Sequence, residues 1–211
     1  MYTVMVTGGI GSGKSTLCKL LCEHGAVSID LDEINRGLLQ DNEDYIRDLT
    51  QRFGADILDE NGAIDRSALA ARAFASPEAE QDLNKIAFPY ITAEASEYIL
   101  DVHCTPRSDA LVLVVEVPLL TEVPELAELA DEIIAVTVPL DVRMQRLLDR
   151  GMDATDALNR INVQASDEER AAIADTICEN GGSLEDLEKW VDNWWLSYTS
   201  QLDFEQVVNH G

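Results

Sequence analysis

The feature that most constrains this chain is a glycine-rich turn near its N-terminus. Residues 8–15 read Gly-Gly-Ile-Gly-Ser-Gly-Lys-Ser and fit the pattern G-x-x-x-x-G-K-[ST] at every position. An apolar segment of strand length precedes the turn, and a segment with helical spacing follows it. The sequence therefore predicts a strand–loop–helix unit whose backbone N–H groups bind the phosphates of a nucleotide.

The residues of this loop have separate predicted tasks. Lys14 is expected to reach the β- and γ-phosphates of ATP, and the Ser15 hydroxyl is expected to ligate Mg²⁺. The other predicted nucleotide-binding residues of the loop are Gly9, Ile10, Gly11, Ser12, Gly13 and Thr16. The loop does not identify the acceptor, since ATPases, GTPases and many kinases share it. The chain has no Asn-Lys-x-Asp segment, with which GTPases usually recognise guanine.

Strand-like and helical patterns alternate along most of the chain. Apolar stretches of strand length occur at residues 2–7, 26–29, 110–117, 132–138 and, more weakly, 174–178. Helical patterns occur at residues 14–23, 140–149, 154–164 and 184–200. Residues 33–105 show only helical patterns, with breaks at Gly54, Asn61-Gly62 and Ser76-Pro77. We expect an α/β fold, a doubly wound parallel sheet of the P-loop type with a helical insertion and a helical lid.

The composition excludes some classes of function. Forty acidic residues oppose fifteen basic ones, so the formal net charge is −25 and a duplex-binding basic stripe is not expected. The acids are spread along the chain, which is typical of a soluble surface; a salt-adapted host is an alternative. No apolar run approaches the roughly 20 residues that cross a bilayer. The start of the chain indicates a core strand and not a secretion signal.

The four cysteines are scattered and indicate reduced thiols in a cytoplasmic protein. The spacing of Cys18 and Cys22 suits packing on one helix face. A metal site there is the alternative, and it needs more ligands than His24 provides.

Two carboxylates follow the second predicted strand, where the carboxyl ends of parallel strands line a ligand crevice. Asp30 and Asp32 precede a helical pattern, so each can either cap that helix or hold the hydroxyl of a phosphoryl acceptor. Arg36 lies one turn further on and can grip an acceptor phosphate, or remain a solvated surface residue.

Five of the fifteen basic residues, all arginines, lie within residues 143–170. Arg143, Arg146 and Arg150 are spaced by three and four residues and should share one helix face, with Arg160 and Arg170 beyond them. A lid that closes on ATP and neutralises charge during transfer would use such arginines. The alternative is a surface helix with ion pairs to the neighbouring acids.

At this point the sequence resembles the dephospho-coenzyme A kinases. The segments that carry the resemblance are Val-Thr-Gly-Gly-Ile-Gly-Ser-Gly-Lys-Ser-Thr at 6–16, Ile-Asp-x-Asp-x-x-x-Arg at 29–36, Val-Pro-Leu-Leu-x-Glu at 117–122, Gln-Arg-Leu-Leu-x-Arg at 145–150, Arg-Ile-x-x-Gln at 160–164 and Ala-Asp-x-Ile-x-x-Asn-Gly at 174–181. The glycine loop alone is general, whereas the ordered set is specific and covers nearly the whole chain.

The resemblance implies transfer of the ATP γ-phosphoryl group to the ribose 3′-hydroxyl of dephospho-coenzyme A, with ATP and Mg²⁺ as cofactors. Asp32 matches the family's base, and Arg36 matches its acceptor-site arginine. Lys14 and Arg146 complete the implied catalytic set, and Arg143 and Arg150 join Arg146 in binding the nucleotide. The implied acceptor contacts also include Pro118, Leu119 and Leu120.

The same resemblance implies the division of the chain. Residues 1–35, 107–149 and 171–211 would form the nucleotide-binding core, residues 36–106 the acceptor-binding insertion, and residues 150–170 the lid. The implied partner is the small-molecule substrate, with no nucleic acid and no membrane, and the oligomeric state is not indicated.

The chain departs from the family pattern at two positions. Glu116 stands where the family usually has Asp, and it can support Mg²⁺ through water. Phe88-Pro89 replaces a common His-Pro pair, so a hydrogen-bonding role of that His is lost here. Two rival readings stay open: another small-molecule kinase of the nucleoside or shikimate type, and an ATP-binding relative without turnover.

Overall fold

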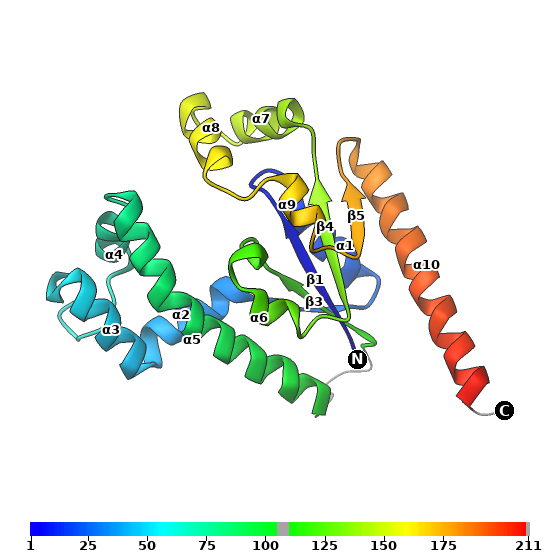
Figure 1. Ribbon diagram of the computed structural model, residues 1–211, viewed down its shortest axis with the longest axis horizontal. Coiled ribbons are helices and arrows are strands. Elements are labelled where there is room, and N and C mark those ends of the chain that lie inside the picture. Colours follow the sequence, from blue (N-terminus) through cyan, green and yellow to red (C-terminus); the bar gives the residue numbers. More distant parts are fainter. Residues whose placement is uncertain (105–109, 210–211) are drawn as a thin grey trace. The chain divides into compact units, whose positions relative to one another are not determined.

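The computed structural model in Figure 1 describes residues 1–104 and 110–209, with side chains as far as residue 200. The chain divides into two compact units. The first contains Met1–Ile29 and Ser108–Gly211, and the second contains Asp30–Arg107. We describe each unit by itself.

A five-stranded parallel sheet runs through the fold, as the sequence predicts. Its strands are β1 (Tyr2–Gly8), β2 (Val27–Asp30), β3 (Val112–Glu116), β4 (Glu132–Thr137) and β5 (Thr176–Glu179). The strand order is β2-β3-β1-β4-β5, so β1 lies at the centre. The inner strands β1, β3 and β4 are largely apolar and buried, as expected where helices cover both faces of a parallel sheet, whereas the edge strands β2 and β5 carry polar, exposed residues.

The register of the sheet fixes what surrounds the glycine loop. Val6 pairs with Glu116 on β3, and Gly8 pairs with Val136 on β4. The loop that follows β1 therefore begins beside the carboxyl end of β3, where Glu116 lies. Because the carboxyl ends of parallel strands share one edge, this edge is the expected place for a ligand. Figure 1 shows α7 and α9 at the same end of β4.

Helices complete the first unit. They are α1 (Lys14–Glu23), η2 (Leu120–Glu122), α6 (Pro124–Ala127), α7 (Leu140–Asp149), α8 (Ala154–Asn162), α9 (Asp167–Ala171) and α10 (Leu184–Asn209). The short helix α9 was not predicted, although Ser166 and Glu169 form a capping box at its start. Helix α10 also runs nine residues beyond the predicted end at residue 200.

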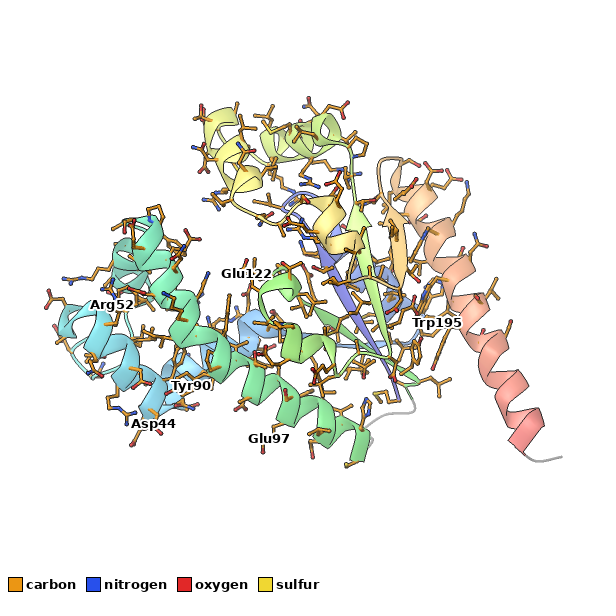
Figure 2. All side chains as sticks on the ribbon, in the orientation of Figure 1. Asp44, Arg52, Tyr90, Glu97, Glu122 and Trp195 are labelled. Atoms are coloured by element: carbon orange, nitrogen blue, oxygen red, sulfur yellow. The ribbon has the colours of Figure 1, made fainter. Side chains whose placement is uncertain are left out.

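The core of the first unit lies between the sheet and two helices. Val4, Leu17 and Ile134 are fully buried, and aromatic side chains of α10 pack against the same cluster. Trp195, labelled in Figure 2, is one of these aromatic residues. Burying a side chain such as Leu17 stabilises the fold by about 1.5–3 kcal/mol, so α1 is held firmly beneath the glycine loop.

The second unit is helical, as predicted for residues 33–105. It contains α2 (Leu31–Asp41), α3 (Glu43–Phe53), η1 (Ala55–Ile57), α4 (Arg66–Ala73) and α5 (Pro77–Cys104). The predicted breaks are confirmed, and the one at Asn61-Gly62 forms a turn closed by an antiparallel bridge between Leu58 and Ile64. Among the described residues, no helix in either unit is both long and apolar enough to span a membrane.

Candidate active site

The glycine loop adopts a backbone that other residues would disturb. Gly11 and Gly13 have φ angles of 78° and 96°, in the left-handed region that favours glycine. A Cβ atom at Gly13 would lie 2.3 Å from Nδ2 of Asn180. The loop closes through a hydrogen bond from the Ser12 N–H to the Gly9 carbonyl, at 3.1 Å. This tight turn leads directly into the N-terminus of α1, whose dipole favours an anion.

Lys14, Ser15 and Glu116 meet at the end of this loop. The Lys14 ammonium donates to the Gly9 carbonyl at 3.3 Å and lies 3.9 Å from Oε1 of Glu116. The Ser15 hydroxyl donates to the same Glu116 oxygen at 3.1 Å. Lys14 is only 8% exposed, and burial lowers its pKa, whereas the Glu116 carboxylate acts in the opposite direction. The structure thus brings these three predicted residues together.

The oxygens of Ser15 and Glu116 are suited to Mg²⁺. The ion prefers hard oxygen ligands and usually takes one or two from the protein, with the rest from water and substrate phosphates. Within residues 1–104 and 110–209, no group of three or more His, Cys, Asp or Glu side chains forms a metal cage. Two adjacent oxygen donors beside a phosphate-binding loop have the chemistry that Mg²⁺ prefers.

Arg146 and Asn180 hold the other side of the loop. Arg146 donates to the Asn180 carbonyl at 2.9 Å and to the Ser12 carbonyl at 3.4 Å. The Asn180 side chain donates to the Ser12 carbonyl at 2.8 Å and is buried. The site prediction omitted Asn180, although the residue directly follows β5. An Asn at the carboxyl end of a strand, next to two glycines, was the signal that could have found it.

A cavity of about 170 Å³ adjoins this part of the loop. Its walls combine a backbone glycine, two arginines and apolar side chains from the start of α10. The lining residues are Gly13, Thr16, Arg146, Arg150, Asn180, Leu184 and Leu187. Four of them were predicted to bind the nucleotide. A larger cavity, of about 550 Å³, lies beside Asp167, Glu179 and Gly181 and contains none of the predicted residues among those that line it.

Arg143 packs against the loop from α7 and is only 6% exposed. Its Nη2 donates to both carboxylate oxygens of Asp167, at 2.7 and 2.8 Å. A Cβ atom at Gly9 would lie 2.8 Å from Nη1 of Arg143, so the guanidinium group lies close against the loop backbone. Arg143 and Arg146, three residues apart on α7, thus both contact the glycine loop. Arg143 contacts the first half of the loop, and Arg146 contacts the second half.

The predicted lid segment contains two contacts that anchor it. The Ile10 N–H donates to Oε1 of Gln164 at 2.7 Å. Arg170 is 1% exposed and donates to the Ala165 carbonyl, and burial lowers the pKa of its guanidinium group. Arg160, in contrast, forms an exposed ion pair with Asp156 within α8. Within this segment, Gln164 thus contacts the loop and Arg170 is buried.

The acidic residues after β2 have different environments. Asp30 is the N-cap of α2, because its side chain accepts hydrogen bonds from the Asp32 and Glu33 N–H groups. The capping interpretation of Asp30 is therefore confirmed. Asp32 follows β2, lies in the first turn of α2 and is exposed. Arg36 donates to Asp30 at 3.4 Å.

The remaining predicted acceptor residues follow β3. Pro118 is exposed and Leu119 is half-buried at the start of η2. Leu120 is 1% exposed and takes a core position. Surface contact with a ligand is therefore available to the first two side chains, while Leu120 supports the turn from within.

Comparison with known proteins gives one consistent result. The family model described as dephospho-CoA kinase matches residues 2–186. A dephospho-CoA kinase of Corynebacterium diphtheriae is 38% identical over 204 residues, which cover 96% of this chain and 100% of that protein. Among solved structures, TT1252 from Thermus thermophilus aligns with a TM-score of 0.71 and 30% identity over 93% of this chain and 97% of that one. A dephospho-CoA kinase from Campylobacter jejuni aligns with a TM-score of 0.70 and 24% identity over 94% of this chain and 98% of that one.

Proposed function

The chain belongs to the dephospho-CoA kinase family, and from this premise we propose how its residues carry out the reaction. It is a P-loop kinase of coenzyme A biosynthesis, and the reaction transfers the γ-phosphoryl group of ATP to the ribose 3′-hydroxyl of dephospho-CoA. The observation that carries the proposed mechanism is the meeting of Lys14, Ser15 and Glu116 at the end of the glycine loop. Free thiols at the four cysteines support a cytoplasmic location.

The phosphates of ATP bind along the loop. Its N–H groups and the positive end of α1 attract the triphosphate, and Lys14 supplies a point charge at the β- and γ-phosphates. Burial makes this charge effective, because an ammonium group that is 8% exposed is little screened by water.

The adenosine part of ATP takes the cavity beside Gly13. Leu184 and Leu187 offer apolar contact, and an arginine guanidinium can stack on a planar base. Arg146 is fixed there by its bonds to the backbone of the loop and of Asn180. We assign Arg146 and Arg150 to the nucleotide, and Arg143 to the support of the loop that holds it.

Ser15 and Glu116 are the residues that would hold Mg²⁺, either directly or through water. When bound with ATP, the ion neutralises charge on the phosphate oxygens. Without it, the Ser15 hydroxyl is already turned toward Glu116, so the two oxygens need little rearrangement. The longer side chain of Glu116, compared with the family's usual Asp, reaches both Ser15 and Lys14 from β3.

Asp32 orients the acceptor hydroxyl and accepts its proton as the new oxygen–phosphorus bond forms. Because Asp30 is occupied in capping α2, the second carboxylate is the one left available for this task. Arg36 lies one turn further on the same helix and binds a phosphate of the acceptor. The phosphate replaces Asp30, to which Arg36 donates at 3.4 Å in the structure. Pro118 and Leu119 provide further contact with the acceptor, over the buried Leu120.

Residues 36–106 form the acceptor-binding insertion in this proposal, and residues 150–170 form the lid. The lid excludes water during transfer and brings Arg150 to the nucleotide. Exchange of backbone amides in residues 150–170 should slow when a non-hydrolysable ATP analogue binds. Full protection without ligand would contradict the lid.

A panel of acceptors tests the proposal. The enzyme is incubated with ATP and, in turn, dephospho-CoA, pantetheine, shikimate and common nucleosides, and ADP release is measured. We expect release with dephospho-CoA far above the others. Release with a different acceptor would identify another small-molecule kinase, and ATP binding without release in any arm would identify a relative that has lost turnover.

A further inference from the structure

A side chain amide of the predicted lid segment contacts the glycine loop. Oε1 of Gln164, two residues after α8, accepts a hydrogen bond from the Ile10 N–H at 2.7 Å. The two residues are 154 positions apart in the chain. A donor–acceptor distance of 2.7 Å lies at the short end of the range for N–H···O hydrogen bonds, so this is a well-formed bond between neutral groups.

Ile10 lies at the outer turn of the loop. The Ser12 N–H donates to the Gly9 carbonyl, so residues 9–12 form a closed turn with the Ile10 amide at its apex. A backbone N–H in such a place needs an acceptor, and Gln164 provides it. The carboxamide therefore helps to hold the turn in the shape from which the following N–H groups face the phosphates.

The residues that follow Gln164 are fixed in place, which stabilises its hydrogen bond to Ile10. Asp167, three positions later, binds Arg143, whose guanidinium group lies against Gly9. Ser166 and Glu169 form the capping box that begins α9, and Arg170 anchors the same helix in the interior. Gln164 thus lies just before a firmly held segment that packs on the same loop through Asp167 and Arg143.

We propose that Gln164 is a positioning residue for the nucleotide, which fixes the outer turn of the glycine loop and joins it to the lid segment. This inference rests on the proposed nucleotide site. The chemistry also explains why a neutral amide is suited to the position. A glutamate would offer the same acceptor oxygen, but its charge beside the loop would repel the phosphates of ATP and ADP.

Three variants test the proposal. Gln164→Ala removes the acceptor, and Gln164→Glu keeps an acceptor but adds a charge. Gln145→Ala is the matched control, because Gln145 is an exposed glutamine on α7 that donates to Asp149. Binding of ATP and of ADP is measured by titration, and thermal unfolding is followed in parallel.

We expect Gln164→Ala to raise the Kd of both nucleotides about 3- to 10-fold, the effect of one lost neutral hydrogen bond. The KM for the acceptor and the melting temperature should match those of Gln145→Ala. Gln164→Glu should weaken binding further at neutral pH, about 10- to 100-fold, and recover toward the wild type as the pH falls and the carboxyl is protonated. An unchanged Kd in Gln164→Ala, or a Gln164→Glu defect that does not depend on pH, would overturn the proposal.

Exchange of the Ile10 amide gives a test that needs no nucleotide. In the ligand-free wild type and in Gln145→Ala the amide should be protected, and in Gln164→Ala it should exchange at least several-fold faster. Equal protection in all three proteins would refute the contact. If wild type and Gln145→Ala bind no ATP at all, the proposed function fails instead, and the Ile10 comparison still decides the role of Gln164.

Discussion

Replacing Asp167 with Asn should destabilise the fold by breaking a buried ion pair. Arg143 is 6% exposed, and its Nη2 uses both oxygens of Asp167. The Nε atom of Arg143 is buried and has no hydrogen-bond partner in the described part of the chain. Nη1 of Arg170 lies 3.6 Å from the same carboxylate. Asp167 therefore compensates two buried guanidinium groups, and Asn cannot replace its charge.

The expected loss is about 3 kcal/mol of unfolding free energy. Removing one partner of a buried ion pair costs about 3–5 kcal/mol, because the other charge stays desolvated. The side chain of Asp167 is 25% exposed, so water relieves part of the penalty and the lower end applies. For a chain of this size, the melting temperature should fall by about 6–12 °C. Urea unfolding followed by tryptophan fluorescence should show a lower midpoint with an unchanged slope.

Two controls separate burial from charge. Asp156→Asn removes the partner of Arg160 in an exposed pair, where such pairs contribute about 0–1 kcal/mol. The double substitution Arg143→Met with Asp167→Leu removes the two charges of this pair and should recover the part of the lost stability that is due to Arg143, while Arg170 stays without its carboxylate. If Asp167→Asn is no less stable than Asp156→Asn, the ion pair does not stabilise the fold and the reasoning is wrong.

Three further predictions concern the reaction and the pH dependence of stability. Lys14→Ala should keep the wild-type melting profile but lose most of its kcat, because the point charge at the phosphates is gone; near-normal kcat would exclude the assigned role. Asp32→Asn should lower kcat by about 10²–10⁴ with little change in the Kd of ATP, whereas Asp30→Asn should mainly cost about 1 kcal/mol of stability; the reverse result would exchange the two roles. Hydrogen bonds from His24 to the Leu20 carbonyl and to Asp192 raise the pKa of its imidazole in the folded protein. The protonated imidazole therefore stabilises the fold fully below its ordinary pKa of about 6.5, and this stabilisation is lost as the pH rises through the pKa of the folded state. His24→Gln should therefore destabilise the protein more at acidic than at alkaline pH, and a loss independent of pH would contradict this.

Most of the fold could be predicted because local patterns determine it. The apolar runs give the buried strands, and the spacing of leucines after Lys14 gives α1. Helix α3 ends at Phe53, just before Gly54, and Asn61-Gly62 forms a turn, because glycine and asparagine favour turn conformations of the backbone. The short helix α9 was missed, because five residues contain too little periodicity to be detected.

The site could be predicted only where the motif or the strand register determines it. Glu116 was found because it stands at a predicted strand end where the resembled family usually has Asp, and Ser15 because the motif specifies it. Gln164 and Asn180 lie in segments that carry the family resemblance, but neither they nor Asp167 were assigned a role, because their partners are distant in the sequence and the segments do not name them.

The central claim is tested most directly by the fate of the transferred group. The enzyme is incubated with dephospho-CoA and ATP whose γ-phosphoryl oxygens are isotopically labelled, and the product is analysed by mass spectrometry and phosphorus NMR. The account predicts a product with the mass of coenzyme A that carries the label as a phosphate monoester on the ribose 3′-oxygen. Recovery of unmodified dephospho-CoA, or of the label at any other position, would contradict it.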